Sequence, residues 1–539
     1  MKKTLYIITL FLAFLQFVSC NNGKSYVEII PSDADFVVQI NPKSIAEKGN
    51  FKELEKYQLS QFVTKEIKNQ DAALAELFDQ IKQSPTSFGL DIISPVYIFG
   101  SKFQNKIIVS LSLNMDDKSD FEDQLKIIYK GVYKKEISFK TENGFTSIDG
   151  IKKPFMKWDK NKFIFIAGEY GTNDKTLNDF FAKINSSEIP LQENNSFKDF
   201  LKNSQDINLW YTGNFVKYFN REIKSSQANL DLSKSSWVTY LSFNNGNISF
   251  THKFHPDIES KVKLEKRPMW KNRINTESYK YFPAESFMNI SFGLHPNNLR
   301  TIKQNNDFLT DLVDTYEIDL ELLKQSFDGD LLFSVFDFEA AQTYSINDYF
   351  NQKETFNQTV IIPQFILAGK MKNHLFFEHL IKKFGPNIVQ IGDHYKVKLN
   401  TNQWVYMILK NDLLYVTNNQ TQLNNFSLNR VTKNNFVTSP YSNNANNPMF
   451  GYINLNLDDY SDEVKSYFLN RLPLSHNPSI QLALQNLKEI NFKASDEYTK
   501  TGAIILKKQS PNSLEFLLHF LDDFYQELTQ NKMYSGETN

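Results

Sequence analysis

Apolar and polar residues alternate along many short segments of the chain, and this period of two is typical of β-strands. The segments are 36–41, 96–100, 106–113, 135–140, 144–149, 154–158, 162–167, 207–212, 237–243 and 247–254. Short polar turns join most of them, such as 244–247, where Asn-Gly tolerates the positive φ of a tight hairpin. Because few crossover helices intervene, the pattern predicts an α+β fold with antiparallel sheets and helices packed on one face.

Helix signals fall between these segments. Asn41 precedes Pro42 as an N-cap before a first helical proline, and a helical tract is expected to continue to about 83. Ser119 and Glu122 form an S-x-x-E capping box that predicts a helix to about 130, and Thr176 opens a short helix. Leucines at helical spacing predict a final amphipathic helix over 514–528.

The same succession of segments occurs twice. Residues 34–45 match 288–299, 106–113 match 364–371, and 156–166 match 406–416, in unchanged order. A conserved order over such a distance predicts a tandem duplication. The first repeat is 26–255, a linker follows over 256–277, the second repeat is 278–528 and a tail closes 529–539; two unrelated α+β domains are the alternative.

The first twenty residues form a secretory leader. Lys2 and Lys3 precede an apolar run over 5–17 that is too short to span a bilayer as an ordinary helix. The segment ends in Phe-Val-Ser-Cys and resembles a bacterial lipobox, which implies that the thiol of Cys20 takes a diacylglycerol and becomes the mature N-terminus. Residues 21–25 are then a short tether. An ordinary secretory signal that happens to contain a cysteine is the alternative.

Charge and composition exclude several classes of protein. Lys+Arg number 60 and Asp+Glu number 61, so nucleic acid is not expected as an electrostatic partner. Hydrophobic residues make up 41% and charged residues 22%, within the globular range. Cys20 is the single cysteine, so the mature fold is expected to have neither an internal disulfide nor a thiolate metal cluster.

A family resemblance begins directly behind the lipobox. Its residues are Pro31, Ala34, 36–38, Asn41, 44–45 and 47–49. They are similar to the opening of a family of uncharacterised bacterial lipoproteins with a domain of unknown function, in which a P-x-D-A stretch and an alternating strand precede an S-[LI]-x-E-K helix start. The resemblance implies a place in the cell envelope of a Gram-negative bacterium and brings no activity, ligand or catalytic residue. Since no acidic cluster follows Cys20, a periplasm-facing position is expected, with the outer membrane favoured.

The residues that could bind a metal or take part in catalysis do not have the spacing that these roles require. His374 and His379 stand five apart, about 140° around a helix, which does not suit one shared metal. His252 and His255 stand at odd spacing on a strand and are expected on opposite faces. Asp328-Gly329-Asp330 could pair carboxylates for a cation, but turn chemistry is the favoured interpretation. The sequence therefore predicts no catalytic residue, no metal and no cofactor.

Three stretches have exposed character. The Asn-rich segment 418–447 is either a glycan- or protein-contacting loop or a tolerated mobile insertion. Trp210 and Tyr211 are strand neighbours, so one is expected in the core and the other could offer a platform for a sugar. The basic linker is expected to contain a strand over 261–264 and to place Trp270 in a seam between the repeats; binding of anionic head groups is the alternative.

These features predict a lipid-anchored cell-envelope protein with a non-catalytic binding or scaffolding role. Its expected partners are the membrane, through the N-terminal lipid, and an envelope protein or a glycan. Two alternatives remain: an envelope hydrolase whose site the sequence does not reveal, and a carrier of a hydrophobic ligand. The sequence favours a role other than catalysis.

Overall fold

The computed structural model describes the chain from Tyr26 to Ser535 with short gaps. The gaps are 59, 63, 66–75, 77–79, 81–84, 152–154, 187–190, 192–193, 220–230, 300–302, 304–309, 312, 315–316, 350–351, 399–403, 472–477 and 509–510. The leader and Cys20 lie outside the described residues, as does most of the helical tract expected up to 83, so these stay predictions.

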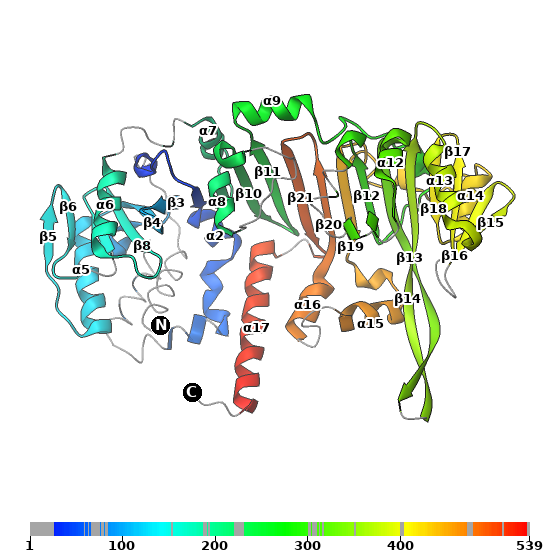
Figure 1. The fold of residues 1–539 in the computed structure, drawn as a ribbon. Helices are drawn as coiled ribbons and strands as arrows, with labels where there is room; N and C mark the ends of the chain where they lie inside the picture. The colour runs from blue at the N-terminus through cyan, green and yellow to red at the C-terminus, as the bar shows by residue number, and fades with distance from the viewer. Residues whose placement is uncertain are drawn as a thin grey trace. The chain divides into compact units, whose positions relative to one another are not determined.

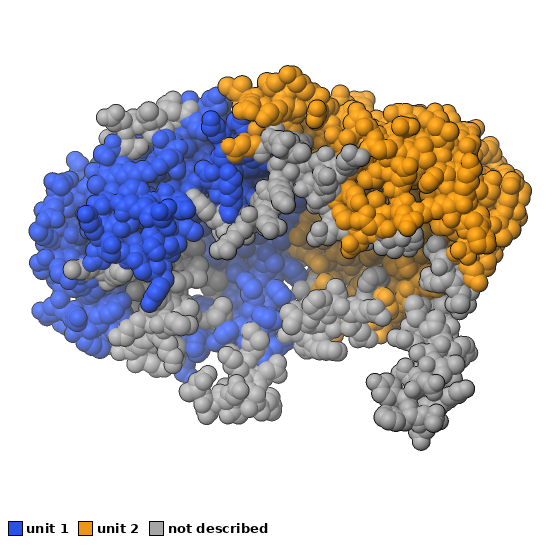
Figure 2. Space-filling model, viewed as in Figure 1, with its two compact units in different colours: residues 1–222, 232–257, 508–539 blue, residues 223–231, 258–507 orange. Residues whose placement is uncertain are grey.

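The chain divides into two compact units, coloured separately in Figure 2. Unit 1 comprises 1–222, 232–257 and 508–539, and unit 2 comprises 223–231 and 258–507. Each contains a large antiparallel sheet with helices packed against it, so the α+β class is confirmed (Figure 1).

The sheet of unit 1 is antiparallel throughout. In spatial order its strands are β11 (Asn247–His255), β10 (Ser236–Asn244), β9 (Ile207–Thr212), β1 (Phe36–Ile40), β3 (Val96–Phe103), β4 (Lys106–Met115), β8 (Lys162–Gly168), β7 (Phe155–Trp158), β6 (Phe145–Ile148) and β5 (Phe139–Glu142). The short β2 (Leu90–Asp91) also pairs with β4. The predicted hairpin at 244–247 is present, with Gly246 at φ 72°.

The sheet of unit 2 repeats this arrangement. In spatial order its strands are β21 (Thr499–Leu506), β20 (Leu487–Ala494), β19 (Met449–Asn454), β12 (Met288–Gly293), β13 (Phe327–Tyr349), β14 (Gln352–Met371), β18 (Leu413–Thr417), β17 (Trp404–Lys410), β16 (His394–Lys398) and β15 (Ile388–Ile391). Strand for strand, the order along the chain matches that of unit 1. This confirms a tandem repeat of one α+β fold.

Around β4 and β14, helices pack on both faces of each sheet, not on one face as predicted. In unit 1, α6 (Asp174–Asn185) and α7 (Asn195–Lys202) pack on the face of β4 that carries Ile108, whereas α5 (Lys118–Ile128) packs on the face that carries Leu111. In unit 2, α14 (Gln420–Ser427) and α13 (Leu375–Phe384) divide the faces in the same way. Strands with apolar residues on both sides need cover on both sides, because exposed apolar area is unfavourable.

The remaining elements are short or peripheral. They include the helices α2 (Pro42–Lys48), α8 (Gly213–Phe219), α9 (Ile258–Lys266), α12 (Leu320–Ser326), α15 (Asp462–Arg471), α16 (Pro478–Asn486), α17 (Ser513–Ser535), η7 (Glu277–Tyr281) and η10 (Phe436–Thr438). Within the described ranges, no helix has both the length and the apolar character that a membrane crossing requires.

Two helix starts show how well capping was predicted. The side chain of Asn41 accepts from the backbone N–H of Ser44, 3.2 Å away, so this N-cap is confirmed. The N-cap of α5 lies two residues earlier than predicted, because Asp117 and not Ser119 caps this helix. The Asp117 carboxylate accepts from two backbone N–H groups of the first turn, which favours it over a hydroxyl.

Two stretches differ from prediction in their structure. Residues 261–264 belong to α9, where ion pairs Lys263–Glu259 and Lys261–Glu265 stand four residues apart. The Asn-rich stretch 418–447 contains α14 and η10 and contributes buried Phe426 and Phe436 to the core, so it is no mobile insertion.

The C-terminal helix α17 is present but belongs to unit 1, not to the second repeat, and it continues through much of the predicted tail. Asp522 accepts from the backbone N–H of Gln58 at 3.1 Å, and His519 lies against Tyr57. At its start, Ser513 donates to the carbonyl of Asn247 at 2.9 Å. These contacts stabilise the helix on the elements of the first repeat.

Candidate functional site

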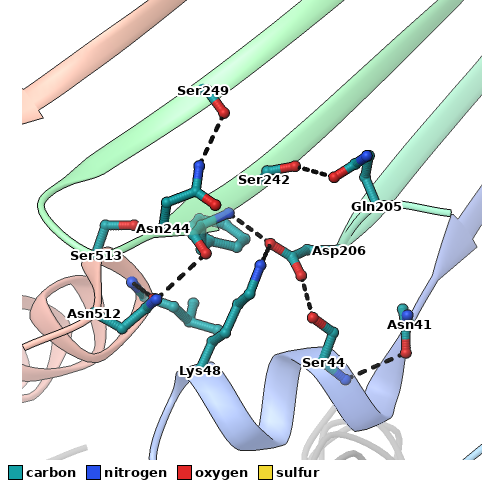
Figure 3. A network of polar contacts seen from close by, with 12 residues as sticks. Asn41, Ser44, Lys48, Gln205, Asp206, Ser242, Asn244, Ser249, Asn512 and Ser513 are labelled. Atoms are coloured by element: carbon teal, nitrogen blue, oxygen red, sulfur yellow. Dashed lines mark hydrogen bonds and ion pairs between the residues drawn. The ribbon is translucent and has the colours of Figure 1, made fainter. Parts of the chain in front are cut away.

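In unit 1, a buried carboxylate accepts hydrogen bonds from residues of the helix start that resembles the family pattern (Figure 3). Asp206, 1% exposed, lies directly before β9. Its carboxylate accepts from the Ser44 hydroxyl, from Lys48 Nζ at 2.7 Å and from the backbone N–H of Phe243 at 2.5 Å. One side chain therefore joins α2, β9 and β10, and we call this set the Asp206 cluster.

The Asp206 cluster gives the S-[LI]-x-E-K pattern a structural meaning. Ser44 and Lys48 stand four apart and so share one face of α2. Asp206 was not predicted from the sequence, because Lys48 and Ser44 lie 158 and 162 residues away from it along the chain. The sequence signal for this site was a serine and a lysine that share one helix face.

Asp328 and Asp330, for which the sequence favoured a role in a turn, both bind a lysine of unit 2. Asp330 is 2% exposed, and Lys271 Nζ lies 2.8 Å from its Oδ1 and 3.2 Å from Oδ2 of Asp328. Burial tends to lower the pKa of Lys271, but its bonds to both carboxylates outweigh this and raise it. Gly329, at φ 113°, forms a bulge where the register of β13 shifts. The pair sits in this bulge inside a strand, not in a turn before it.

The two histidines of β11 face opposite sides of the sheet, as predicted. His252 Nδ1 lies 2.9 Å from the Thr239 hydroxyl. His255 Nε2 lies 3.6 Å from Asp199 Oδ2, which also bonds Lys253 at 2.9 Å. Burial lowers the pKa of His255, against the pull of Asp199. The two rings are held in separate contacts.

Among the described residues, no group of three or more His, Cys, Asp or Glu is placed to hold a metal ion. His374 precedes α13 as its N-cap residue and is exposed, and His379 is half-buried one turn on. This is the amphipathic helix that the spacing of these histidines favoured.

The strand pair Trp210-Tyr211 divides as predicted. Trp210 is buried and donates to the Ser196 hydroxyl at 2.8 Å. Tyr211 faces the other side, where its ring stacks on Trp237 at 5.4 Å, and Trp237 stacks on Phe254 at 4.9 Å. Burial raises the pKa of Tyr211.

This aromatic row is part of a larger apolar surface of unit 1. The register aligns successive rows across β11, β10, β9 and β1. They are Phe254–Trp237–Tyr211–Phe36, His252–Thr239–Leu209–Val38 and Phe250–Leu241–Ile207–Ile40, and every member is half-buried. Residues of the opposite face, such as Val37, Trp210 and Val238, are fully buried. Phe215 of α8 partly covers the surface at Phe36, with ring centroids 4.7 Å apart.

The corresponding strands of unit 2 carry an equivalent surface. The register aligns β21, β20, β19 and β12. The rows are Ile504–Ile490–Ile453–Met288, Gly502–Phe492–Gly451–Ile290 and Lys500–Ala494–Met449–Phe292. Their large apolar members are half-buried, whereas Ser291 and Phe450 on the other face are fully buried. We call these two surfaces, one per unit, the apolar strand faces.

Trp270 lies beside this surface inside unit 2, where the sequence had placed it in a seam between the repeats. Its ring stacks on Phe292 at 6.3 Å, and its backbone N–H donates to Glu497 Oε1 at 2.7 Å. Burial raises the pKa of Glu497 despite this bond. Residues 258–277 of the segment that was predicted to be a linker thus belong to unit 2.

Comparison with known proteins gives a family and little more. Residues 26–514 match the family described as "Domain of unknown function (DUF4836)". No curated protein matches the chain. Crystal forms III and IV of TP0453 are similar to it at 13% and 14% identity, over 45% of this chain and 86% and 84% of theirs, each with a TM-score of 0.25. Likenesses at this score support no inference about function.

Proposed function

The chain belongs to the DUF4836 family, which comes without an assigned activity, and from that premise we propose a lipid-anchored cell-envelope protein that binds an extended apolar ligand without catalysis. Cys20 carries the anchor in this proposal, and the apolar strand faces carry the ligand. The anchor rests on the sequence, and the binding role rests on the structure.

One observation supports the binding role: the apolar strand face recurs on the same four strands of both units. Trp237 and Phe492 take equivalent places in the two registers, and both are half-buried, whereas Val238 and Phe450 on the opposite faces are fully buried. Each square ångström of apolar area left in water costs about 25 cal/mol relative to burial. A contiguous apolar surface that stays partly in water therefore marks an interaction site.

The chemistry of the rows indicates the kind of ligand. In unit 1, Thr239 and His252 are the polar members of three rows, and they bond to each other. In unit 2, Lys500 is the charged member, and it lies at the exposed end of its row. A surface with so few polar groups favours a long hydrocarbon chain over a sugar or a peptide, whose polar groups would lose their hydrogen bonds with water.

A lipid anchor would hold the binding body beside its ligand source. Two or three acyl chains on Cys20 hold a protein firmly at a bilayer, because each buried methylene contributes about 0.8 kcal/mol. The tether of residues 21–25 is short, so the folded body would lie close to the membrane surface.

The test is binding of a fluorescent long-chain fatty acid to the Cys20→Ser chain, with Trp237→Ala and Phe492→Ala made separately. Each variant should weaken binding at its own surface. Trp404→Ala is the matched control, since Trp404 is also a half-buried strand aromatic but lies on β17, outside these rows. Absence of fatty-acid binding by the parent chain, or equal loss in all three variants, would refute the proposal.

A further inference from the structure

We propose that a cavity in unit 2 binds a small oxyanion, a phosphate or carboxylate group, between the ammonium groups of Lys370 and Lys410. The cavity has a volume of about 120 Å³ and lies between η7, α14 and strands β13, β14, β17 and β18. Leu332 lines it and pairs with Ser291, so the cavity lies on the sheet face opposite the apolar strand face. The inference is therefore independent of the proposed function.

The sheet register brings the two lysines together. Lys370 of β14 pairs with Leu413 of β18, and Leu413 pairs with Lys410 of β17. The three residues share one face of the sheet, so the two lysines flank Leu413 at a backbone separation of about 10 Å. Both lysine side chains are half-buried and line the cavity. Phe426 and Tyr281, whose rings meet edge to face at 4.9 Å, line the cavity from the covering elements.

The charges around the cavity leave these two cations in excess. The two acidic side chains in the lining already have partners: Glu277 bonds Lys280 at 3.0 Å, and Asp330 bonds Lys271 at 2.8 Å. Lys410 Nζ donates to the carbonyl of Ser427 at 2.5 Å, which leaves its charge unbalanced. Across the described ranges, no hydrogen bond or ion pair reaches the ammonium of Lys370.

A partly buried pair of like charges without a counter-charge is unfavourable unless an anion joins it. Lysine is a suitable ligand for such a group, because its ammonium is a compact point charge with three donors. Asn411 and Ser278 add polar groups to the lining. The volume corresponds to about four water molecules, so a head-group-sized anion fits and a larger metabolite does not.

Isothermal titration of the Cys20→Ser chain with inorganic phosphate tests the site directly. Phosphate should bind, and Lys370→Gln or Lys410→Gln should each weaken its affinity about tenfold or more, because each removes one charge-assisted contact. Lys370→Arg should retain binding, since it keeps the charge. Lys372→Gln is the matched control, because Lys372 lies two residues further on, is exposed and does not line the cavity.

Two further titrants identify the source of the anion. Binding of dihexanoyl phosphatidic acid with the same dependence on Lys370 would support the site and point to a lipid head group, whereas preference for free phosphate would support it and point to a soluble ion. Equal binding of acetate would support it as a general carboxylate site. Failure of phosphate, phosphatidic acid and acetate to bind at millimolar concentration would overturn the inference, as would a loss in Lys372→Gln equal to that in Lys370→Gln.

Discussion

The Asp206 cluster gives the sharpest prediction about stability. Replacing Asp206 by alanine removes the acceptor of three donors that come from α2 and β10 (Figure 3). The backbone N–H of Phe243 would stay buried without a partner, at a cost of about 1–3 kcal/mol. The Ser44 hydroxyl would lose a bond worth about 0.5–1.5 kcal/mol.

Lys48 contributes less to the expected loss. Its side chain is 29% exposed and can turn its ammonium to water, so its share is about 0–1 kcal/mol. The three contributions predict that Asp206→Ala lowers the free energy of unfolding of unit 1 by about 3 kcal/mol. Lys48→Met should cost less, although it leaves the carboxylate buried, because two donors still reach Asp206.

Urea unfolding followed by tryptophan fluorescence measures these differences, since unit 1 contains Trp158, Trp210 and Trp237. Asp123→Ala is the control: it removes an exposed ion pair with Lys126 on α5, and a change within about 0.5 kcal/mol is expected. In the double variant, the effects of Asp206→Ala and Lys48→Met should be less than additive, because the second loses its partner in the first. A loss below about 1 kcal/mol for Asp206→Ala, or strict additivity, would refute the reasoning.

Three other predictions concern separate parts of the chain. Cys20→Ser should move the protein from the membrane to the soluble envelope fraction, and unchanged membrane pelleting would contradict the anchor. Gly329→Ala should destabilise unit 2 by at least about 2 kcal/mol, because the φ of Gly329 is 113° and the new Cβ would lie 2.0 Å from the Leu294 carbonyl oxygen. Gly392→Ala is the control: the space around Gly392 is open, so urea unfolding should show a loss of only about 1 kcal/mol. Burial raises the pKa of Glu497 above its ordinary value of 4.5, so the folded chain keeps this proton to a higher pH than the unfolded chain does. The stability of the wild-type chain should therefore fall as pH rises from 4.5 through the raised pKa. Glu497→Gln should abolish this pH dependence of stability. Urea midpoints between about pH 4 and 7 check this, and a wild-type stability that rises relative to the variant would contradict it.

The sequence was informative wherever a signal is local. Alternating residues located most strands to within a few positions, because the period of two is a property of the strand itself. Asn41 and Pro42 fixed the start of α2, because a cap is formed within one turn. The repeated order of segments also revealed the duplication, since it needs no knowledge of contacts.

Local signals were misread where two short patterns overlap. Val262 and Leu264 alternate with lysines as in a strand, yet the stretch is helical because its charged residues also pair at helical spacing. The Asn-rich stretch was judged by its composition, but Phe426 and Phe436 are what place it in the core. A few large apolar side chains outweigh many polar ones, because burial scales with apolar area.

By itself, then, the sequence determined the class of fold, its duplication and the expected address of the protein. The tertiary structure alone decided which distant residues meet. Asp206 joins partners more than a hundred residues away, Lys370 and Lys410 flank one leucine through the strand register, and α17 returns to the first repeat. The half-buried state of the apolar strand faces is also a tertiary property, because strand periodicity predicts which residues share a face but not how much of that face other elements cover.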